Sequence, residues 1–122
     1  MNLLLDTHFV IELVEERFSI GGMVRDEDVL FVSAVNLWEI AIKHRLGKLR
    51  LGVKPAEVPA LVEHGGIQIV DIDRHHVLAE LNVVPPTRDP FDQLLLAQCQ
   101  VEGMRLVTVD DKLVSHPLAW RP

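Results

Sequence analysis

Apolar residues along this chain gather in short runs that alternate with longer stretches of helical spacing. The runs lie at residues 3–5, 30–32, 67–70 and 106–109. A short, mainly apolar run bounded by turn residues is typical of a strand buried on both faces. The pattern therefore predicts four buried strands.

Stretches between these runs have the apolar spacing of helices. They lie at residues 7–15, 19–26, 34–46, 55–63, 73–81 and 90–102. Ser33 and Asp89 precede two of them as N-cap residues, and Gly47 and Gly103 follow the same two as stop signals. Strands that alternate with helices predict a parallel sheet with helices on both faces, which is a three-layer α/β/α sandwich.

The chain length and its last residues complete this expectation. With 122 residues the chain has the length of one compact domain, so we expect residues 1–122 to form a single domain. Leu118, Ala119 and Trp120 predict a short edge strand. The apolar residues of the first helical region are a candidate partner surface, and the alternative is that they pack on the sheet: Phe9, Ile11, Leu13, Val14 and Phe18.

Acidic residues follow two of the predicted strands. Asp6 comes directly after the first and Asp110 directly after the fourth, while Asp111 is expected to start the next turn. In an open parallel sheet, ligands bind in the crevice outside the carboxyl ends of the strands. We therefore expect Asp6 and Asp110 at a binding crevice, with a helix N-cap as the alternative role for Asp6.

Glu39 lies within a predicted helix, where a carboxylate needs an explanation. On a helical wheel it falls about 40° from Val35, beside an apolar stripe that continues through Ile42 and Leu46. A charge at that position is costly unless it has a partner or a cation. The two alternatives are a bound ion and an ion pair with Lys43, four residues later.

Asp92 presents a similar choice at the start of the last predicted helix. Asp89 is expected as the N-cap and Asp92 as the third helical residue, where an acid can serve the helix dipole alone. Asp92 nevertheless shares its face with Leu95 and Leu96. It is therefore expected to point toward packed structure, which leaves Asp89 as the structural acid.

The four candidate acids suit a hard cation. Asp6, Glu39, Asp92 and Asp110 would repel one another at one crevice unless a cation neutralises them. Oxygen ligands of this kind favour Mg²⁺ or Mn²⁺, which keep several waters and bind phosphates directly. The chemistry that follows is metal-assisted hydrolysis of a phosphodiester.

The net charge of −6 opposes nucleic-acid binding by bulk electrostatics. Basic residues are nonetheless concentrated at residues 43–54 and again at residues 74–88, where they can position phosphates. The candidate RNA-binding residues are Lys43, Arg45, Lys48 and Arg88. For Lys43 and Arg45, the alternative is that these cations only stabilise a solvated helix C-terminus. The histidines show no zinc spacing, and Trp38 and Phe91 are expected in the core.

The cellular compartment is suggested by what the sequence does not contain. Cys99 is the lone cysteine and cannot form an internal disulfide, which suits a reducing environment. The first residues lack the basic start of a signal peptide, and no stretch approaches the ~20 apolar residues of a membrane helix. We expect a cytoplasmic protein with no membrane contact.

Four segments resemble the motifs of PIN-domain nucleases in their order and spacing. They are LLLDTH at residues 3–8, SAVNLWEI at 33–40, RDPFDQLLLAQ at 88–98 and LVTVD at 106–110. Within that family the chain is most similar to the VapC toxins of bacterial type II toxin–antitoxin pairs. The resemblance covers essentially the whole chain.

This resemblance implies a PIN fold and a ribonuclease that uses Mg²⁺ or Mn²⁺. The catalytic and metal-binding acids of the family fall on Asp6, Glu39, Asp92 and Asp110. The implied partners are an RNA substrate, a second copy of the chain in a homodimer, and a cognate antitoxin whose tail occupies the active site.

Two other functions compete with this one. A catalytically inactive PIN-like module would bind RNA or protein without cleaving anything. A phosphoacceptor receiver domain suits the length and the α/β alternation, but it needs an acidic pair after the first strand, where Asp6 is alone. Metal-dependent cleavage would separate the enzyme from the module, and phosphorylation of one aspartate would support the receiver.

Overall fold

The central feature of the computed structural model, which describes residues 1–16 and 24–121, is a four-stranded parallel sheet. Its strands are β1 (Asn2–Leu5), β2 (Val29–Ser33), β3 (Gln68–Val70) and β4 (Arg105–Val107), arranged in the order β3-β2-β1-β4. Leu4 of β1 pairs with Phe31 on one side and with Leu106 on the other. The four predicted strands and their parallel arrangement are confirmed.

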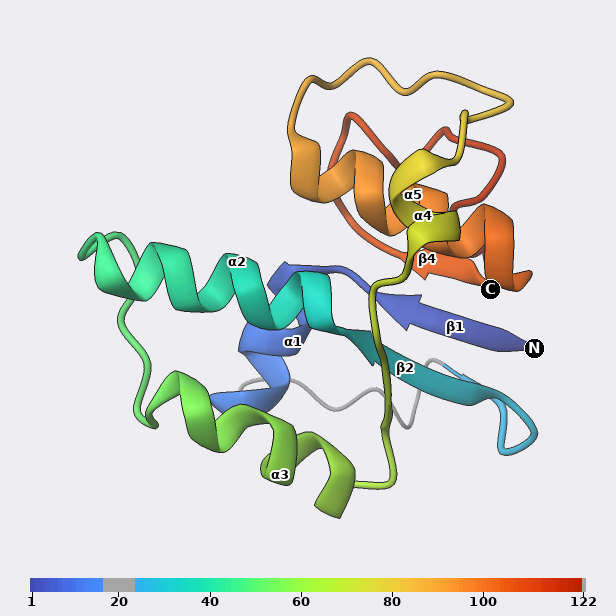
Figure 1. Cartoon of the computed structure of the whole chain (residues 1–122). Helices are drawn as coiled ribbons and strands as arrows, with labels where there is room; N and C mark the ends of the chain where they lie inside the picture. Colours follow the sequence, from blue (N-terminus) through green and yellow to red (C-terminus); the bar gives the residue numbers. More distant parts are fainter. Residues whose placement is uncertain (17–23, 122) are drawn as a thin grey trace.

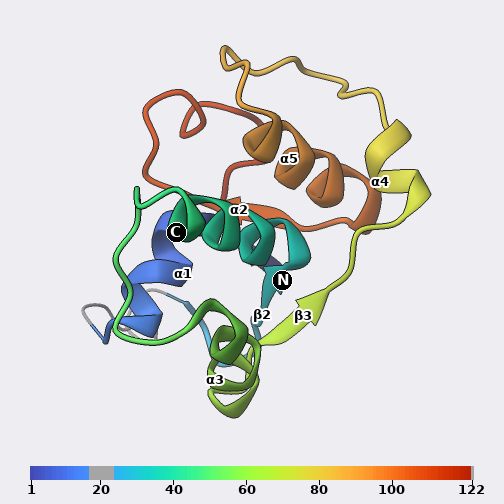
Figure 2. The same cartoon turned by 60° about the vertical axis from the view of Figure 1, so that its left-hand side comes forward.

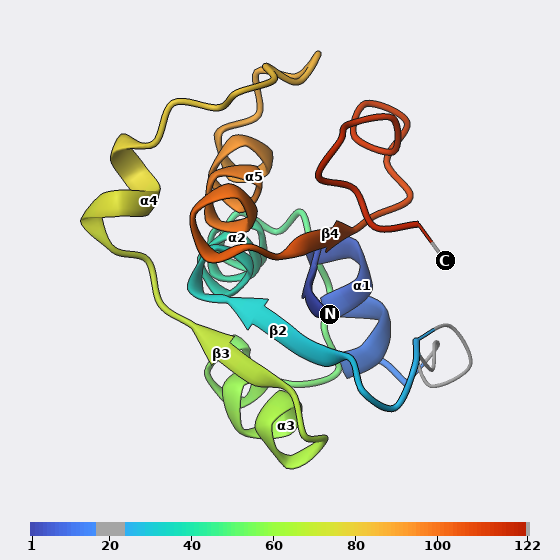
Figure 3. The same cartoon turned by 90° about the vertical axis from the view of Figure 1, so that its right-hand side faces the viewer.

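Helices cover both faces of this sheet (Figures 1 and 3). They are α1 (Thr7–Val14), α2 (Ala34–Arg45), α3 (Val58–His64), α4 (Arg74–Leu78) and α5 (Pro90–Glu102), with the short 3-10 helix η2 (Pro55–Glu57) before α3. Side chains alternate along β1, so Leu3 and Leu5 pack with residues of α1 and α3 while Leu4 packs with α5. The three-layer α/β/α sandwich is therefore confirmed.

Helix α2 lies between α1 and α5, which places it beside both layers (Figure 2). Ser33 caps its N-terminus, as expected. The expected apolar stripe is wrong in the last turn, because Leu46 is 62% exposed. The buried side of α2 instead carries Val35, Asn36, Glu39 and Ile40. The buried positions all lie in its first two turns, where α2 packs against its neighbours.

The segment after β3 differs from its prediction. The helix expected at residues 73–81 ends at Leu78. The cause is a tertiary contact, because the side chain of Gln100 donates to the Glu80 carbonyl and accepts from the Asn82 N–H. These bonds hold the chain along α5 and prevent another helical turn.

The other differences are smaller. The helix expected at residues 19–26 falls mostly outside the described residues, and residues 24–26 are not helical. The expected edge strand is a single parallel bridge between Ala119 and Leu106. Strand β4 ends at Val107, two residues earlier than expected, so Asp110 does not follow it directly. The Asp110 N–H donates instead to the Thr108 hydroxyl, in the loop after the strand.

The first helix does not present an apolar surface. Phe9 is buried, and Ile11, Leu13 and Val14 pack against the core cluster, so the alternative of packing on the sheet is correct. Phe18 lies outside the described residues. Among the helices of residues 1–16 and 24–121, none has the length and apolar character needed to cross a membrane.

Candidate active site

The four acids predicted from the sequence line one hollow of about 420 Å³, the acidic hollow. Its other lining residues are Thr7, His8, Ile11, Lys43, Asp89 and Val109. The hollow lies beyond the carboxyl ends of β1 and β4. The chain continues from β1 to β2 and β3 on one side, whereas β4 lies on the other side of β1. This is the topological switch point at which open parallel sheets bind ligands.

Asp6 is both a helix cap and a lining residue of the acidic hollow. Its N–H donates to the Val107 carbonyl at 3.1 Å and so extends the pairing of β1 with β4. Its carboxylate accepts from the Phe9 N–H at 3.1 Å and caps α1. Burial raises the pKa of Asp6, and hydrogen bonds from Thr108 and Phe9 oppose that rise. The capping role therefore does not remove this carboxylate from the hollow.

Glu39 is buried and held at both of its oxygens. Oε1 accepts a hydrogen bond of 2.6 Å from the Thr7 hydroxyl. Oε2 forms an ion pair with Nζ of Lys43 at 2.5 Å. The expected i,i+4 ion pair is therefore present, and it lies inside the acidic hollow rather than away from it.

Asp89 and Asp92 have different roles at the start of α5: Asp89 caps the helix, whereas Asp92 contributes its charge to the acidic hollow. Oδ1 of Asp89 accepts from the Phe91 N–H at 2.8 Å, which makes Asp89 the N-cap, as expected. The pKa of Asp92 is raised to about 6. Partial burial is the largest cause, and the negative charges of Asp89, Asp110, Glu39 and Asp6 raise the pKa further. Asp92 therefore sits in a field of like charge that a cation would relieve.

Asp110 is exposed at the edge of the acidic hollow. Its carboxylate accepts from the Lys112 N–H at 2.8 Å, and its carbonyl accepts from Leu113 and Val114. Asp110, rather than Asp111, therefore starts the turn. Its charge contributes to the raised pKa of Asp6 and of Asp92, so the three carboxylates lie within electrostatic reach of one another.

The donor set of the acidic hollow fits a hard divalent cation. The carboxylates of Asp6, Glu39, Asp92 and Asp110 offer oxygen ligands from four different elements or loops, with Asp89 close by. Mg²⁺ and Mn²⁺ take such ligands and retain water in the remaining positions. Lys43 contributes a positive charge to the lining, and it forms an ion pair with Glu39.

Of the basic residues considered for RNA binding, Lys43 alone lies in the acidic hollow. Arg45, Lys48 and Arg88 are exposed outside its lining. Nε of Arg45 donates to the Ala41 carbonyl, which ties this side chain to its own helix.

Sequence reasoning missed three features of this region. Thr7 and Asn36 form buried hydrogen bonds that reach Glu39, and their only sequence signal is their position beside Asp6 and at the capping box of α2. Trp38 is not a core residue, since it is 53% exposed. Its ring centroid lies 5.3 Å from that of Phe91 of α5, in an edge contact.

A second group of potential ligands lies away from the acidic hollow. Ligand atoms of Asp73, His76 and Glu102 lie within 4.8 Å of one another. The His76 ring is already hydrogen-bonded on both sides, because Nδ1 accepts from the Asp73 N–H and Nε2 contacts Glu102 at 2.8 Å. A neutral ring with its proton on Nε2 satisfies both bonds. His76, the buried member of this group, therefore links α4 to Glu102 of α5.

Comparison with known proteins identifies the family. The profile of the family described as PIN domain matches residues 3–117. The chain belongs to the PIN domain family. This family membership excludes the receiver-domain alternative. PIN domains are generally nucleases and typically use divalent metals.

Structural comparison supports the same fold. A solved structure described as VapBC2 from Rickettsia felis bound to a DNA fragment from their promoter contains a chain similar to this PIN domain. The TM-score is 0.61 at 14% sequence identity, and the match covers 98% of this chain and 96% of the other. No curated protein matches the sequence at a significant level.

Proposed function

We propose that this PIN domain is a Mg²⁺- or Mn²⁺-dependent endoribonuclease and the toxin of a type II toxin–antitoxin pair. The observation that carries the proposal is that the carboxylates of Asp6, Glu39, Asp92 and Asp110 line one hollow, and the raised pKa of Asp92 supports it. Charges gathered in this way at a switch point repel one another unless a cation joins them. Surplus negative charge therefore favours a metal site over a purely structural cluster.

Asp6, Asp92 and Asp110 would hold the ion directly, and Glu39 in part through water. When bound, such an ion lowers the pKa of a coordinated water and stabilises the negative charge that develops on the phosphodiester. The protein holds Asp6 rigidly at the end of β1 through the Val107 and Phe9 backbone bonds. Asp92 is held in the first turn of α5.

The basic side chains complete the site toward the substrate. Lys43 forms an ion pair with Glu39 in the lining of the acidic hollow, and its ammonium would contact an RNA phosphate that enters there. Arg45, Lys48 and Arg88 are assigned to the RNA backbone farther from the cleaved bond. Local cations and a bound metal would offset the net charge of −6.

The proposed partners are a cognate antitoxin and a second copy of this chain, acting in the cytoplasm. The VapC resemblance supports the antitoxin, and the similar structure is itself described as VapBC2. An antitoxin that blocks the site should present an arginine, because a guanidinium matches paired carboxylates. It would compete with the metal for the same charge, so excess Mg²⁺ should weaken inhibition.

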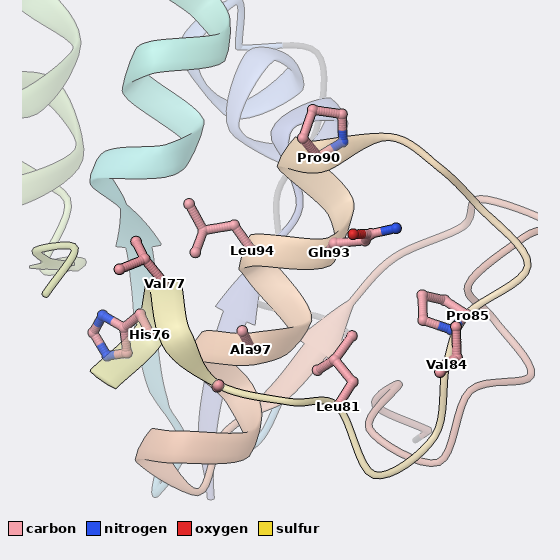
Figure 4. Close-up of a pocket in the computed structure, with 10 residues that line it drawn as sticks. His76, Val77, Leu81, Val84, Pro85, Pro90, Gln93, Leu94 and Ala97 are labelled. Atoms are coloured by element: carbon pink, nitrogen blue, oxygen red, sulfur yellow. The ribbon is translucent and has the colours of Figure 1, made fainter. Parts of the chain in front are cut away.

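The homodimer contact is assigned to an apolar hollow of about 420 Å³ on the other side of α5 (Figure 4). Val77 of α4, Leu94 of α5 and Leu81 line it. Val84, which also lines the hollow, is 79% exposed, and Leu78, the residue after Val77 in α4, is 78% exposed. An exposed apolar cluster of this kind usually marks a partner surface.

The deciding experiment is incubation of purified, antitoxin-free protein with mixed RNA. We expect cleavage with Mg²⁺ or Mn²⁺, and none with EDTA or in Asp92→Asn. RNA binding without cleavage under all metal conditions would instead identify an inactive PIN-like module. DNA in a parallel reaction tests the choice of RNA as substrate.

A further inference from the structure

Two buried polar side chains connect the start of α2 to Glu39. Oδ1 of Asn36 accepts from the Ser33 N–H at 2.7 Å. Nδ2 of Asn36 donates to the Thr7 hydroxyl at 3.0 Å, and that hydroxyl donates to Oε1 of Glu39 at 2.6 Å. Both Asn36 and Thr7 are buried, so these bonds form away from solvent.

The direction of every bond in this relay is determined by its two ends. The Ser33 backbone N–H can only donate, so it must face the Asn36 carbonyl oxygen and leave the Nδ2 amide toward Thr7. An amide nitrogen also only donates, so the Thr7 oxygen accepts from it. The single proton of the Thr7 hydroxyl is then left for Glu39.

The relay is attached to the helix that carries Asp92. The Ser33 hydroxyl donates to Oε1 of Gln98, a fully buried residue of α5. Nε2 of Gln98 donates in turn to the Asp71 carbonyl at 3.2 Å, after β3. The orientation of Asn36 is therefore tied to the packing of α2 against α5.

We propose that Thr7 and Asn36 are positioning residues that aim Glu39 into the metal site. The inference rests on the proposed function. The relay occupies Oε1 of Glu39 and leaves Oε2, the oxygen now paired with Lys43, for the metal or for a water on it. Asn36 acts only through Thr7. Hydrogen-bond partners that orient a metal ligand in this way lower the freedom that the ligand loses on binding.

The first test is calorimetric titration of Mn²⁺ alone into the wild type, Thr7→Val and Thr7→Ser. Valine has nearly the shape of threonine but cannot donate to Glu39, whereas serine keeps the hydroxyl. We expect Thr7→Val to bind Mn²⁺ about tenfold more weakly, as outer-shell changes typically do, and Thr7→Ser to stay within about twofold of the wild type.

The second test asks whether Asn36 works through Thr7. Asn36→Ala should weaken Mn²⁺ binding in the wild type but cause no further loss in a Thr7→Val background, because residues of one network are not additive. The control is Asp73→Ala, which removes the side-chain cap of α4 outside the relay. It should lower the melting temperature and leave the Mn²⁺ affinity unchanged.

The outcomes separate the relay from the function on which it rests. Wild-type affinity in Thr7→Val, or equal losses from Asn36→Ala in both backgrounds, overturns the relay and leaves the nuclease proposal standing. A wild-type protein that binds no Mn²⁺ overturns both. Should Asn36→Ala fail to fold, the Thr7→Val and Thr7→Ser pair decides alone.

Discussion

Two hollows of about 420 Å³ each flank the first turns of α5, and they differ in chemistry rather than in size. Asp89 and Asp92 belong to the acidic hollow, whereas Pro90, Gln93 and Leu94 belong to the apolar one. Neighbouring residues at the start of α5 thus face different hollows, because successive side chains of a helix point in different directions. The two hollows have the same volume. They differ in their unfavourable interactions, which are repulsion between carboxylates in one and exposure of apolar side chains to water in the other.

The two hollows would be stabilised by different kinds of ligand. In the acidic hollow, like charges contribute to the raised pKa of Asp92, and a cation would remove that cost. In the apolar hollow, the exposed side chain of Val84 remains in contact with water, and an apolar partner would remove that cost. A substitution in one hollow should therefore leave the other function intact.

The largest expected effect comes from Asp92→Asn. The substitution removes a proposed metal ligand, so cleavage should fall by more than about 100-fold while the protein stays folded. Asp89→Ala is the matched control on the same turn. It should lose about 1 kcal/mol of unfolding free energy, as N-cap removal does, and keep most of its activity. Cleavage rates and urea unfolding measure both, and the reverse pattern would assign the catalytic acid to Asp89.

The next effect belongs to the apolar hollow. Val84→Asp places a charge in the proposed dimer contact, twice in a symmetric interface, so the dissociation constant of the dimer should rise at least about tenfold. Light scattering over a range of concentrations measures it, and Mn²⁺ affinity should not change. A wild type that is monomeric at every accessible concentration would contradict the assignment.

A smaller effect is expected from Lys43→Met, which removes the cation of the acidic hollow. Loss of one phosphate contact should weaken RNA binding by about fivefold and lower the salt dependence by about one ion. Binding of RNA to the uncleaving Asp92→Asn variant, with and without Lys43→Met, gives the comparison. Arg105→Met is the control, because Arg105 is exposed at the start of β4, the opposite end of the strands. Equal losses from both would show that only net charge matters.

The smallest effect is a pH dependence of stability in EDTA. The pKa of Asp92 is raised to about 6, so its carboxyl group binds a proton more tightly in the folded protein than in the unfolded chain. The resulting stabilisation is present below about pH 4 and is lost as the pH rises through 6. Between pH 5 and 7 the wild type should lose about 1 kcal/mol relative to Asp92→Asn, after allowance for solvent screening of a half-buried group. Parallel urea curves at the two pH values would show no difference if Asp92 titrates normally.

The outcome of each sequence-based expectation depended on the range of the interaction behind it. Ser33, Asp89 and Gly103 act on their own helix ends, and the structure has them where local rules place them. Trp38 was expected in the core because it is large and apolar, but exposure depends on what lies opposite α2. The end of α4 depends in the same way on Gln100, which is 20 residues from Glu80 in the sequence.

The four strands, the parallel sheet, the main helix caps and the acids of the PIN motifs could all be predicted from the amino-acid sequence. These features depend on short apolar runs and on hydrogen bonds within a few residues. Only the tertiary structure decided that Glu39 receives its hydrogen bond from Thr7, 32 residues away, and that an apolar hollow lies behind the acids on α5. The physical reason is that such contacts form between side chains that only packing brings together, and no local pattern records the partner.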